Sequence, residues 1–272
     1  MTSIAFIGSG NMAGAIIGGL VENGFDKQSL WASDPSQDRI NELTNTLGIQ
    51  GTTNNITAIE QADVVILAIK PQVMEAVLSP LKEALQEKKP LIISVAAGIN
   101  LHSINAWTGG DLAIVRCMPN TPALVQQGAS GLYANQQVSE NQKVISEQIL
   151  NAVGMSVWVN EETQLDAVTA VSGSGPAYFF LFMEAMIEAG TKLGLSAETA
   201  KELTLKTALG AATMASNSSD SPSELRKKVT SPNGTTEKAI NSFIHQDLSK
   251  IVETALQAAN DRSVELCKEL GA

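Results

Sequence analysis

The sequence predicts an α/β protein in which a doubly wound parallel sheet is followed by an all-helical domain. In the first 160 residues, short apolar runs alternate with amphipathic segments of helical period. This pattern is typical of a parallel sheet covered by helices on both faces. Beyond about residue 160 the strand pattern stops and only helical patterns remain. We therefore expect two domains, at residues 1–160 and 161–272.

The expected strands are short and apolar throughout, as are strands buried on both faces of a sheet. No apolar run approaches the roughly 18 residues of a membrane-spanning helix, so we expect no membrane association. The expected strands are Ile4–Ile7, Leu30–Ser33, Val64–Ile69, Leu91–Ala96, Leu112–Met118, Gly131–Ala134 and Ser156–Val159.

Helical periodicity separates these strands and fills the second domain. Gly173, Gly175 and Pro176 fall inside one long pattern, so we expect a kink or break there. In the first domain the expected helices are Met12–Asn23, Gln37–Leu47, Val73–Glu87, Leu101–Trp107 and Glu140–Ala152. In the second they are Glu162–Leu193, Ala197–Ser216, a short one opened by the capping box Ser221–Glu224, Thr235–His245, and one from its cap Asp247 to about Leu270.

Composition excludes several functional classes. The 272 residues include 28 acidic and 18 basic side chains, a net charge of −10 that argues against nucleic acid as a partner. Two histidines, and two cysteines without metal-ligand spacing, argue against a zinc site or a disulfide framework. The N-terminus begins with a strand pattern instead of a basic segment, so we expect no signal peptide and a cytoplasmic location.

A glycine-rich turn joins the first expected strand to the first helix. Gly8 permits a tight turn, Gly10 lets the backbone approach a pyrophosphate, and the small Ala13 lets the helix pack on the strand. The free N–H groups and the dipole at the helix start favour an anion there. The spacing predicts a Rossmann-type dinucleotide site, and a glycine turn that binds nothing is the alternative. The turn comprises Gly8, Ser9, Gly10, Asn11, Met12 and Ala13.

The end of the second expected strand bears on the choice of cofactor. Asp34 lies about where an acidic group holds the ribose 2′-hydroxyl of NAD(H). Neighbouring hydroxyls and Arg39 would instead accept the 2′-phosphate of NADP(H). A third interpretation is that Asp34 and Ser36 only cap the next helix. The residues alone leave these alternatives open.

Two further segments carry polar groups where a ligand would lie. Lys70 follows the third expected parallel strand, at the edge where doubly wound proteins bind ligands, although a solvated lysine is the alternative. The break Ser172–Pro176 offers hydroxyls and N–H groups to a small carboxylate, or it is a glycine hinge. Pro119–Thr121 follows the fifth expected strand, where these residues would face the nicotinamide or the substrate. The alternative is that they form an ordinary turn.

These motifs occur in the order seen in pyrroline-5-carboxylate reductases, which the sequence resembles from Ile4 to its last helix. The segments Met-Pro-Asn-Thr-Pro at 118–122 and Ser-Gly-Ser-Gly-Pro-Ala at 172–177 are specific to that family. The segments that carry the resemblance are the glycine turn, Ala68–Pro71, Arg116–Pro122, Ser172–Tyr178 and Ser231–Thr236.

The resemblance implies reduction of the imine of 1-pyrroline-5-carboxylate to L-proline, the last step of proline biosynthesis. NADPH is the implied hydride donor, with NADH as the alternative. Hydride would pass to the imine carbon while the ring nitrogen is protonated, so the protein mainly orients two ligands. The resemblance also implies that the helical domain builds a homodimer, with a decamer as the larger assembly.

The same resemblance assigns roles to individual residues. Thr236 would hydrogen-bond the imine nitrogen and, with Lys70, form the catalytic pair, although Thr235 and Thr236 would alternatively cap a helix. The expected cofactor-binding residues are the six of the glycine turn with Ser33, Asp34, Asn55, Ala68, Ile69, Lys70, Pro71 and Asn120. The expected substrate-binding residues are Ser172, Gly173, Ser174, Gly175, Pro176, Thr235 and Thr236.

Three positions depart from the family pattern. Asn233 stands where relatives usually have glycine, and asparagine tolerates the left-handed conformation, so we expect the turn to persist. Lys227 replaces an acid, so no acidic role is carried over to it. Asp34 replaces a frequent hydroxyl residue, which weakens the expected NADPH preference.

Two other functions are consistent with the architecture. The β-hydroxyacid dehydrogenases are similar at the glycine turn, but they depend on an interdomain lysine that Ser172–Glu188 lacks. A non-catalytic nucleotide-binding protein is the second alternative, and the polar break at Ser172–Ser174 counts against it. Small residues along Ala208–Ala215 and the apolar stripe of Leu248–Leu266 also predict at least a homodimer.

Overall fold

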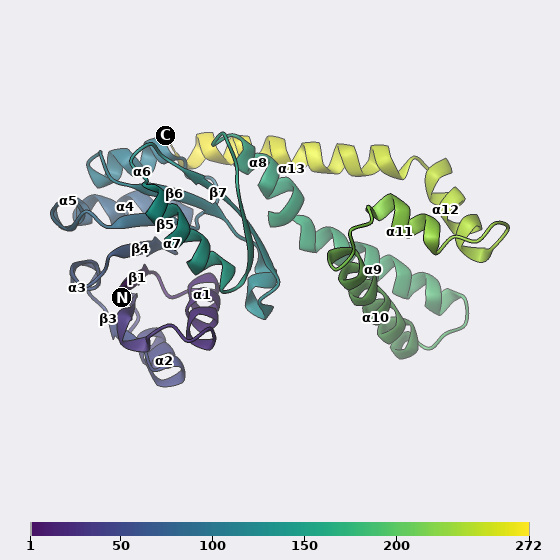
Figure 1. Cartoon of the computed structure of the whole chain (residues 1–272), viewed down its shortest axis with the longest axis horizontal. Helices are drawn as coiled ribbons and strands as arrows, with labels where there is room; N and C mark the ends of the chain where they lie inside the picture. The colour runs from purple at the N-terminus through teal and green to yellow at the C-terminus, as the bar shows by residue number, and fades with distance from the viewer. Residues whose placement is uncertain (1, 272) are drawn as a thin grey trace. The chain divides into compact units, whose positions relative to one another are not determined.

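An eight-stranded sheet organises the first part of the chain, in a computed structural model that describes residues 2–271 (Figure 1). The strand order β3-β2-β1-β4-β5-β6-β7-β8 reverses between β1 and β4, which creates the crevice where doubly wound proteins bind ligands. The strands are β1 (Ile4–Ile7), β2 (Leu30–Ser33), β3 (Gln50–Thr52), β4 (Val64–Leu67), β5 (Leu91–Ser94), β6 (Ile114–Met118), β7 (Gly128–Ala134) and β8 (Gly154–Trp158).

All neighbouring strands are parallel except β6 and β7, so β7 and β8 run in the direction opposite to the other six strands. Only a short connection containing the 3₁₀ segment Thr121–Val125 joins β6 to β7. A crossover between parallel strands needs about a dozen residues or more, so this connection favours a return in the opposite direction. The expected doubly wound fold is confirmed, with one antiparallel pair added to it.

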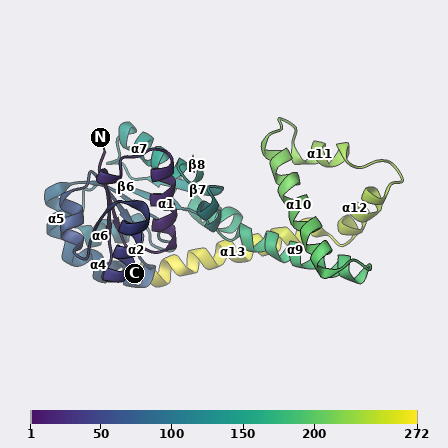
Figure 2. The ribbon, with the colours of Figure 1, turned by 90° about the horizontal axis from the view of Figure 1, so that it is seen from below.

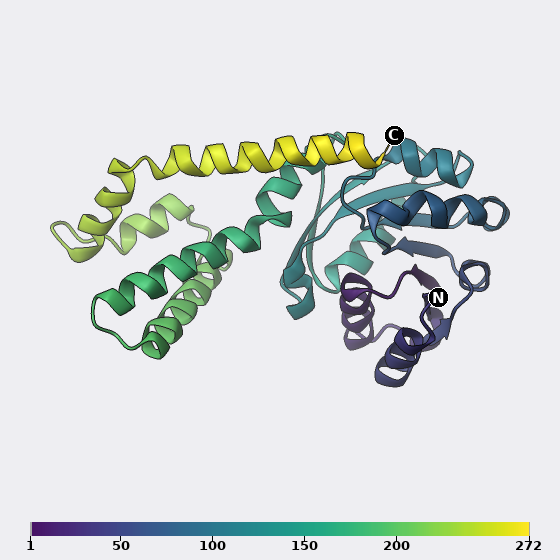
Figure 3. The ribbon, with the colours of Figure 1, turned by 180° about the vertical axis from the view of Figure 1, so that it is seen from behind.

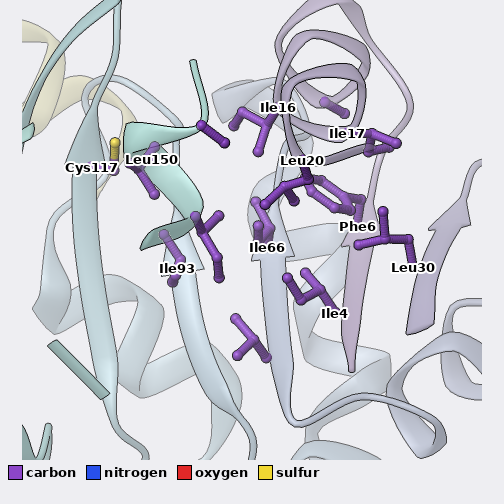
Figure 4. Packing of buried hydrophobic residues seen from close by; sticks show 14 of the residues in the cluster. Ile4, Phe6, Ile16, Ile17, Leu20, Leu30, Ile66, Ile93, Cys117 and Leu150 are labelled. Atoms are coloured by element: carbon purple, nitrogen blue, oxygen red, sulfur yellow. The ribbon is translucent and has the colours of Figure 1, made fainter. Parts of the chain in front are cut away.

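Helices cover both faces of the sheet, because successive side chains of a strand point to opposite faces. Ile4 and Phe6 belong to the core on one face (Figure 4), and Ala5 and Ile7 belong to the core on the other. Figure 2 shows α1 and α7 on one side of the strands and α4 to α6 on the other. The helices of the first face are α1 (Asn11–Glu22), α2 (Gln37–Leu47) and α7 (Glu140–Asn151). Those of the second are α3 (Asn55–Glu60), α4 (Met74–Leu78), α5 (Lys82–Lys88) and α6 (Leu101–Thr108).

Most expected elements are confirmed to within a few residues, but three differ. The single helix expected at Val73–Glu87 is wrong, because the 3₁₀ segment Ser79–Leu81 separates α4 from α5. Pro80 in that segment has no N–H to continue an α-helix. The strand β3 and the helix α3 lie where we expected neither.

The chain divides into two compact units, one running to Ser174 and resuming at Ala258, the other being Gly175–Gln257. These boundaries differ from residue 160, and the domains 1–160 and 161–272 stay a prediction. In the second unit α9 packs against α10. The helices that form it are α9 (Gly175–Lys192), α10 (Ala197–Ser216), α11 (Pro222–Lys228), α12 (Thr235–His245) and the first turns of α13 (Leu248–Leu270).

The break expected near Gly173 is confirmed. The short helix α8 (Gln164–Val168) continues into a π-helical turn, Thr169–Gly173, before α9 begins. The capping box of α11, between Ser221 and Glu224, is also confirmed. The expected cap at Asp247 is wrong: this residue has a left-handed backbone (φ 54°) between α12 and α13, a tight turn and not the extended conformation of an N-cap.

The last turns of α13 belong to the first unit and lie beside α6 (Figure 3). Ser103 Oγ donates a hydrogen bond to the carbonyl of Gly271 at 2.6 Å, and Leu270 packs against the second core. Ser263 Oγ donates to Asp166 Oδ1 at 2.6 Å. Among residues 2–271, no helix is long and apolar enough to cross a bilayer, and no cluster of potential metal ligands occurs.

Candidate active site

The glycine turn lies at the carboxyl end of β1, next to the end of β4. Gly8 has a φ of 96°, in the left-handed region that favours glycine. A Cβ there would stand 2.6 Å from the carbonyl oxygen of Ala68 and 2.8 Å from Ile69 Cγ2. The turn therefore requires glycine at position 8, both for its conformation and for its contact with β4.

The start of α1 is open to a ligand. Gly10 is the N-cap residue, and it offers no side chain to the first N–H groups of the helix. A Cβ on Gly10 would meet no atom within 4 Å, and a cavity of about 340 Å³ borders the turn at Ser9, Gly10 and Asn11. Uncapped N–H groups at a helix start bind anions. The turn thus fits the pyrophosphate of a dinucleotide.

Asp34 braces this turn from the end of β2. Its Oδ2 accepts hydrogen bonds from the N–H (3.0 Å) and the Oγ (2.8 Å) of Ser9, and its Oδ1 accepts one from the N–H of Ser36 (3.0 Å). Arg39 completes the network by donating from Nη2 to the carbonyl of Ser9 at 3.0 Å. Ser36 caps α2, as one of the open interpretations had it, whereas the Asp34 carboxylate links β2 to the glycine turn.

The charge state of Asp34 follows from this network. Burial alone would raise the pKa of its carboxyl group, but the hydrogen bonds from Ser36 and Ser9 and the positive charge of Arg39 outweigh burial. The pKa of Asp34 is consequently lowered. Asp34 is an anion at neutral pH.

Two other expected cofactor-binding residues pair with each other nearby. Ser33, fully buried at the end of β2, donates from Oγ to Asn55 Oδ1 at 2.6 Å. Asn55 is the first residue of α3, a helix that Asn54 caps by accepting from the N–H of Ile56. The structure thus brings Ser33 and Asn55 to the same edge as Asp34.

The segment after β4 forms part of the same edge. Ala68 donates its N–H to the carbonyl of Ile7 at 2.9 Å, which places Ala68 and Ile69 against the glycine turn. Lys70 is exposed and precedes the 3₁₀ turn that begins at Pro71. Its ammonium group has no hydrogen-bond or ion-pair partner within residues 2–271, so it can reach a ligand at this edge of the sheet.

Asn120, at the end of β6, is buried, and both polar atoms of its side-chain amide form hydrogen bonds. Its Nδ2 donates to the carbonyl of Ser172 at 3.0 Å, and its Oδ1 accepts from the N–H of Ala129 at 2.8 Å. Asn120 therefore joins the end of β6 to β7 and to the π-helical turn.

The polar break at Ser172–Pro176 is a π-helical turn followed directly by α9. The N–H of Ser174 donates to the carbonyl of Thr169 at 2.8 Å, and Ser172 Oγ donates to the carbonyl of Val168 at 3.0 Å. The hydroxyl of Ser174, in contrast, makes no hydrogen bond within residues 2–271. Ser174 is therefore the serine of this turn whose hydroxyl is available to a substrate.

Thr235 and Thr236 begin α12, in the second unit. The N-cap residue of this helix is Gly234, so the alternative that either threonine caps α12 is wrong. Asn233 has a φ of 59°, which confirms that asparagine adopts the left-handed conformation expected there. Both threonines occupy the first turn of the helix, where backbone N–H groups are uncapped.

One ion pair near this region was not predicted from the sequence. Arg116 of β6 lies 2.6 Å from Glu162 Oε1, and that same oxygen accepts from the N–H of Leu101 at 2.7 Å. The signal for it was an arginine inside an apolar strand, since a buried charge requires a partner. The pair connects β6, the start of α6 and the segment before α8.

Two family profiles match the chain. The profile described as pyrroline-5-carboxylate reductase dimerisation matches residues 162–266. The profile described as NADP oxidoreductase, coenzyme F420-dependent, matches residues 3–98. The first profile lies in the helical half and the second covers the glycine turn, Asp34, Asn55 and Lys70.

Individual relatives match nearly the whole chain. A pyrroline-5-carboxylate reductase of Pseudomonas aeruginosa is 55% identical over 268 residues, covering 98% of both chains. One from Haemophilus influenzae is 46% identical, covering 97% of both. The solved structure of a pyrroline-5-carboxylate reductase from Coxiella burnetii has a TM-score of 0.95 at 44% identity, covering 100% of this chain and 99% of that one. The structure of a Plasmodium falciparum pyrroline carboxylate reductase with NADP bound has a TM-score of 0.84 at 31% identity, covering 98% of both chains.

Proposed function

This chain belongs to the pyrroline-5-carboxylate reductase family, and we propose that it reduces 1-pyrroline-5-carboxylate to L-proline with NADPH as hydride donor. The main support is the open glycine turn between β1 and β4, where the strand order reverses, in a chain that matches reductases over 98% of its length. NADH is the alternative donor, since Asp34 is anionic and stands near the ribose position.

The cofactor is proposed to lie along the carboxyl edge of the sheet. The N–H groups at the start of α1 would hold its pyrophosphate, and Ser33, Asp34 and Asn55 would surround its adenosine end. Lys70 and Ala68–Pro71 would border it from β4. The nicotinamide supplies the hydride when bound.

The substrate is proposed to use the two polar helix segments. The free hydroxyl of Ser174 would bind the carboxylate of the ring, and the hydroxyl of Thr236 would hold the imine nitrogen in its protonated form. An iminium carbon is already electrophilic, so these groups orient the ring and no strong acid is required.

The assembly and location belong to the same proposal. The chain carries a dimerisation domain, and we place it in a homodimer, with a decamer as the larger assembly built from such dimers. The two cysteines, Cys117 and Cys267, are free thiols, which supports a reducing compartment such as the cytoplasm.

The test is a spectrophotometric assay with 1-pyrroline-5-carboxylate and either NADPH or NADH, following the nicotinamide absorbance. We expect turnover, and we expect Thr236→Ala to lower kcat by about one to two orders of magnitude, as loss of one positioned hydrogen bond does. The affinity for NADPH should stay unchanged.

The control is Ser242→Ala, which changes a hydroxyl further along the same helix and should retain normal kcat. No turnover with either cofactor would contradict the proposed activity. A Thr236→Ala enzyme with normal kcat would contradict the role of Thr236 alone.

A further inference from the structure

The carbonyl of Ser172 lacks its ordinary helical partner. In an α-helix it would accept from the N–H four residues later, which is Pro176, and proline has no N–H. A carbonyl that is shielded from water and left without a donor destabilises the fold, and the Ser172 carbonyl lies in a partly buried position. The side chain of Asn120 supplies the missing donor at 3.0 Å.

A second contact places the same turn beside the same strand end. A Cβ on Gly173 would stand 2.6 Å from Met118 Cε, the mobile end of a flexible side chain, so this contact shows proximity and does not fix the turn. The hydrogen bond from Asn120 is therefore the contact that holds the turn. Asn120 and Met118 both belong to the short segment at the end of β6.

The register of this turn determines where Ser174 lies. Ser174 follows the π-helical turn directly and is tied to it by its N–H bond to the carbonyl of Thr169. Its hydroxyl has no partner of its own within residues 2–271, so only the backbone sets its position. A shift of Thr169–Gly173 would carry Ser174 with it.

We propose that Asn120 is a positioning residue for the substrate, and that it acts through the carbonyl of Ser172 instead of through contact with the cofactor. Its amide replaces the donor that Pro176 lacks, and it thereby holds Ser174 in place for the substrate carboxylate. The inference rests on the proposed function for its substrate.

The first test is Asn120→Asp, which preserves the acceptor for the N–H of Ala129 and removes the donor to Ser172. The Michaelis constant for 1-pyrroline-5-carboxylate should rise about tenfold or more, because the Ser172 carbonyl loses its donor and the turn that carries Ser174 is no longer held. The dissociation constant of NADPH, measured by calorimetry, should stay within about twofold of the wild-type value. A weakened NADPH affinity with an unchanged Michaelis constant for the substrate would overturn the proposal.

Asn135, which follows β7, provides a matched control because its side-chain amide also bonds to two backbone groups. Its Nδ2 donates to the carbonyl of Leu112 at 2.8 Å and its Oδ1 accepts from the N–H of Ile114 at 3.1 Å, at the opposite end of β6. Asn135→Asp should lower the melting temperature as Asn120→Asp does, without raising the Michaelis constant. An equal rise in both variants would show a general effect of stability and would overturn the proposal.

A double-mutant cycle tests whether the Asn120 amide replaces the N–H that Pro176 lacks. Pro176→Ala returns an N–H to the position four residues after Ser172, so the combination with Asn120→Asp should recover part of the lost substrate affinity. Strict additivity of the two substitutions would contradict the link between Asn120 and Pro176.

Hydrogen exchange separates this inference from the proposed activity. Exchange of the Ser174 amide should accelerate in Asn120→Asp, and this readout requires no turnover. If the wild-type protein fails to reduce the substrate, the proposed function fails while exchange still tests the turn. Unchanged protection at Ser174 would overturn the positioning role.

Discussion

At the scale of single residues, Asp34 stabilises the glycine turn whichever cofactor the protein binds. Its carboxylate already accepts three hydrogen bonds from Ser9 and Ser36. Because its pKa is lowered, this bracing is fully present above the ordinary aspartate value of 3.8 and is lost as the pH falls through the lowered pKa. Ribose binding and helix capping were the roles that the sequence indicated for Asp34, and the structure adds stabilisation of the glycine turn as a third.

Asp34→Ser should therefore have two effects. Removal of the negative charge should raise the ratio of kcat/KM for NADPH to that for NADH, since an anion repels a 2′-phosphate. Loss of the brace on Ser9 should weaken both cofactors by several-fold. Steady-state kinetics with each cofactor will measure both effects, with the exposed Asp38→Ser on α2 as control. An unchanged ratio would limit Asp34 to the bracing role.

Gly8 and Gly10 should respond differently to substitution. Gly10→Val should weaken NADPH binding at least about 100-fold while the melting temperature changes little, because its Cβ position is open and faces the expected pyrophosphate. Gly8→Ala should instead destabilise the fold by roughly 1–3 kcal/mol, since it forces a left-handed alanine against Ala68. Calorimetric titration and thermal unfolding of both variants check this. An equal change of melting temperature in Gly8→Ala and Gly10→Val would contradict the prediction that only Gly8 is required by the fold.

At the scale of elements, strands and helices with a clear apolar pattern could be predicted from the sequence. The ranges of β1, β2, α2, α10 and α12 agree with the expected ones at both ends. The strand β3 is Gln-Gly-Thr at the edge of the sheet, so it carries no apolar run to predict it. Its pairing with β2 is a long-range contact that local pattern does not contain.

The candidate site was predictable only in part, for a similar reason. The glycine turn carries its own spacing, whereas the partners of Asn120 lie 9 and 52 positions away along the chain. A sequence shows that Asn120 is polar and follows a strand. It does not show that both ends of the amide are already engaged.

The ion pair between Arg116 and Glu162 gives a prediction at this scale. Glu162→Gln removes the salt-bridge partner that the Arg116 guanidinium, which is 10% exposed, has among residues 2–271, and we expect a loss of about 3 kcal/mol in the free energy of unfolding. The double variant Arg116→Met with Glu162→Leu should recover part of that loss, because the charges of both partners are removed, although the N–H of Leu101 loses its acceptor. Urea unfolding of the three proteins measures this, and a stable Glu162→Gln protein would contradict it.

At the scale of the whole molecule, the second unit leaves large apolar side chains exposed. Phe179, Leu181, Leu209 and Ile251 are each 59–68% exposed in the isolated chain. Patches of this kind mark association surfaces, and the dimerisation profile covers all four residues. A second copy of the chain is the expected occupant.

Leu209→Glu should consequently shift the protein toward monomer in sedimentation velocity. The kcat for reduction of 1-pyrroline-5-carboxylate should fall as well if formation of the dimer positions Thr236 for the substrate. Lys201→Glu, at a position of α10 that is already charged and exposed, is the control and should leave the assembly intact. A monomeric Leu209→Glu protein with full activity would show that the site is complete in one chain.

The return of the chain to the first unit has a consequence for synthesis on the ribosome. The segment from Ala258 onward supplies Leu270 to the second core and Gly271 to Ser103, yet it is translated last. The first unit therefore remains incomplete until Gly175–Gln257 has been synthesised. The segment from Ala258 onward must then bind to the earlier part of this unit, which closes a loop at an entropic cost that grows slowly with loop length. Nascent chains halted before Ala258 should be trimmed by protease within the first unit, whereas full-length chains should resist.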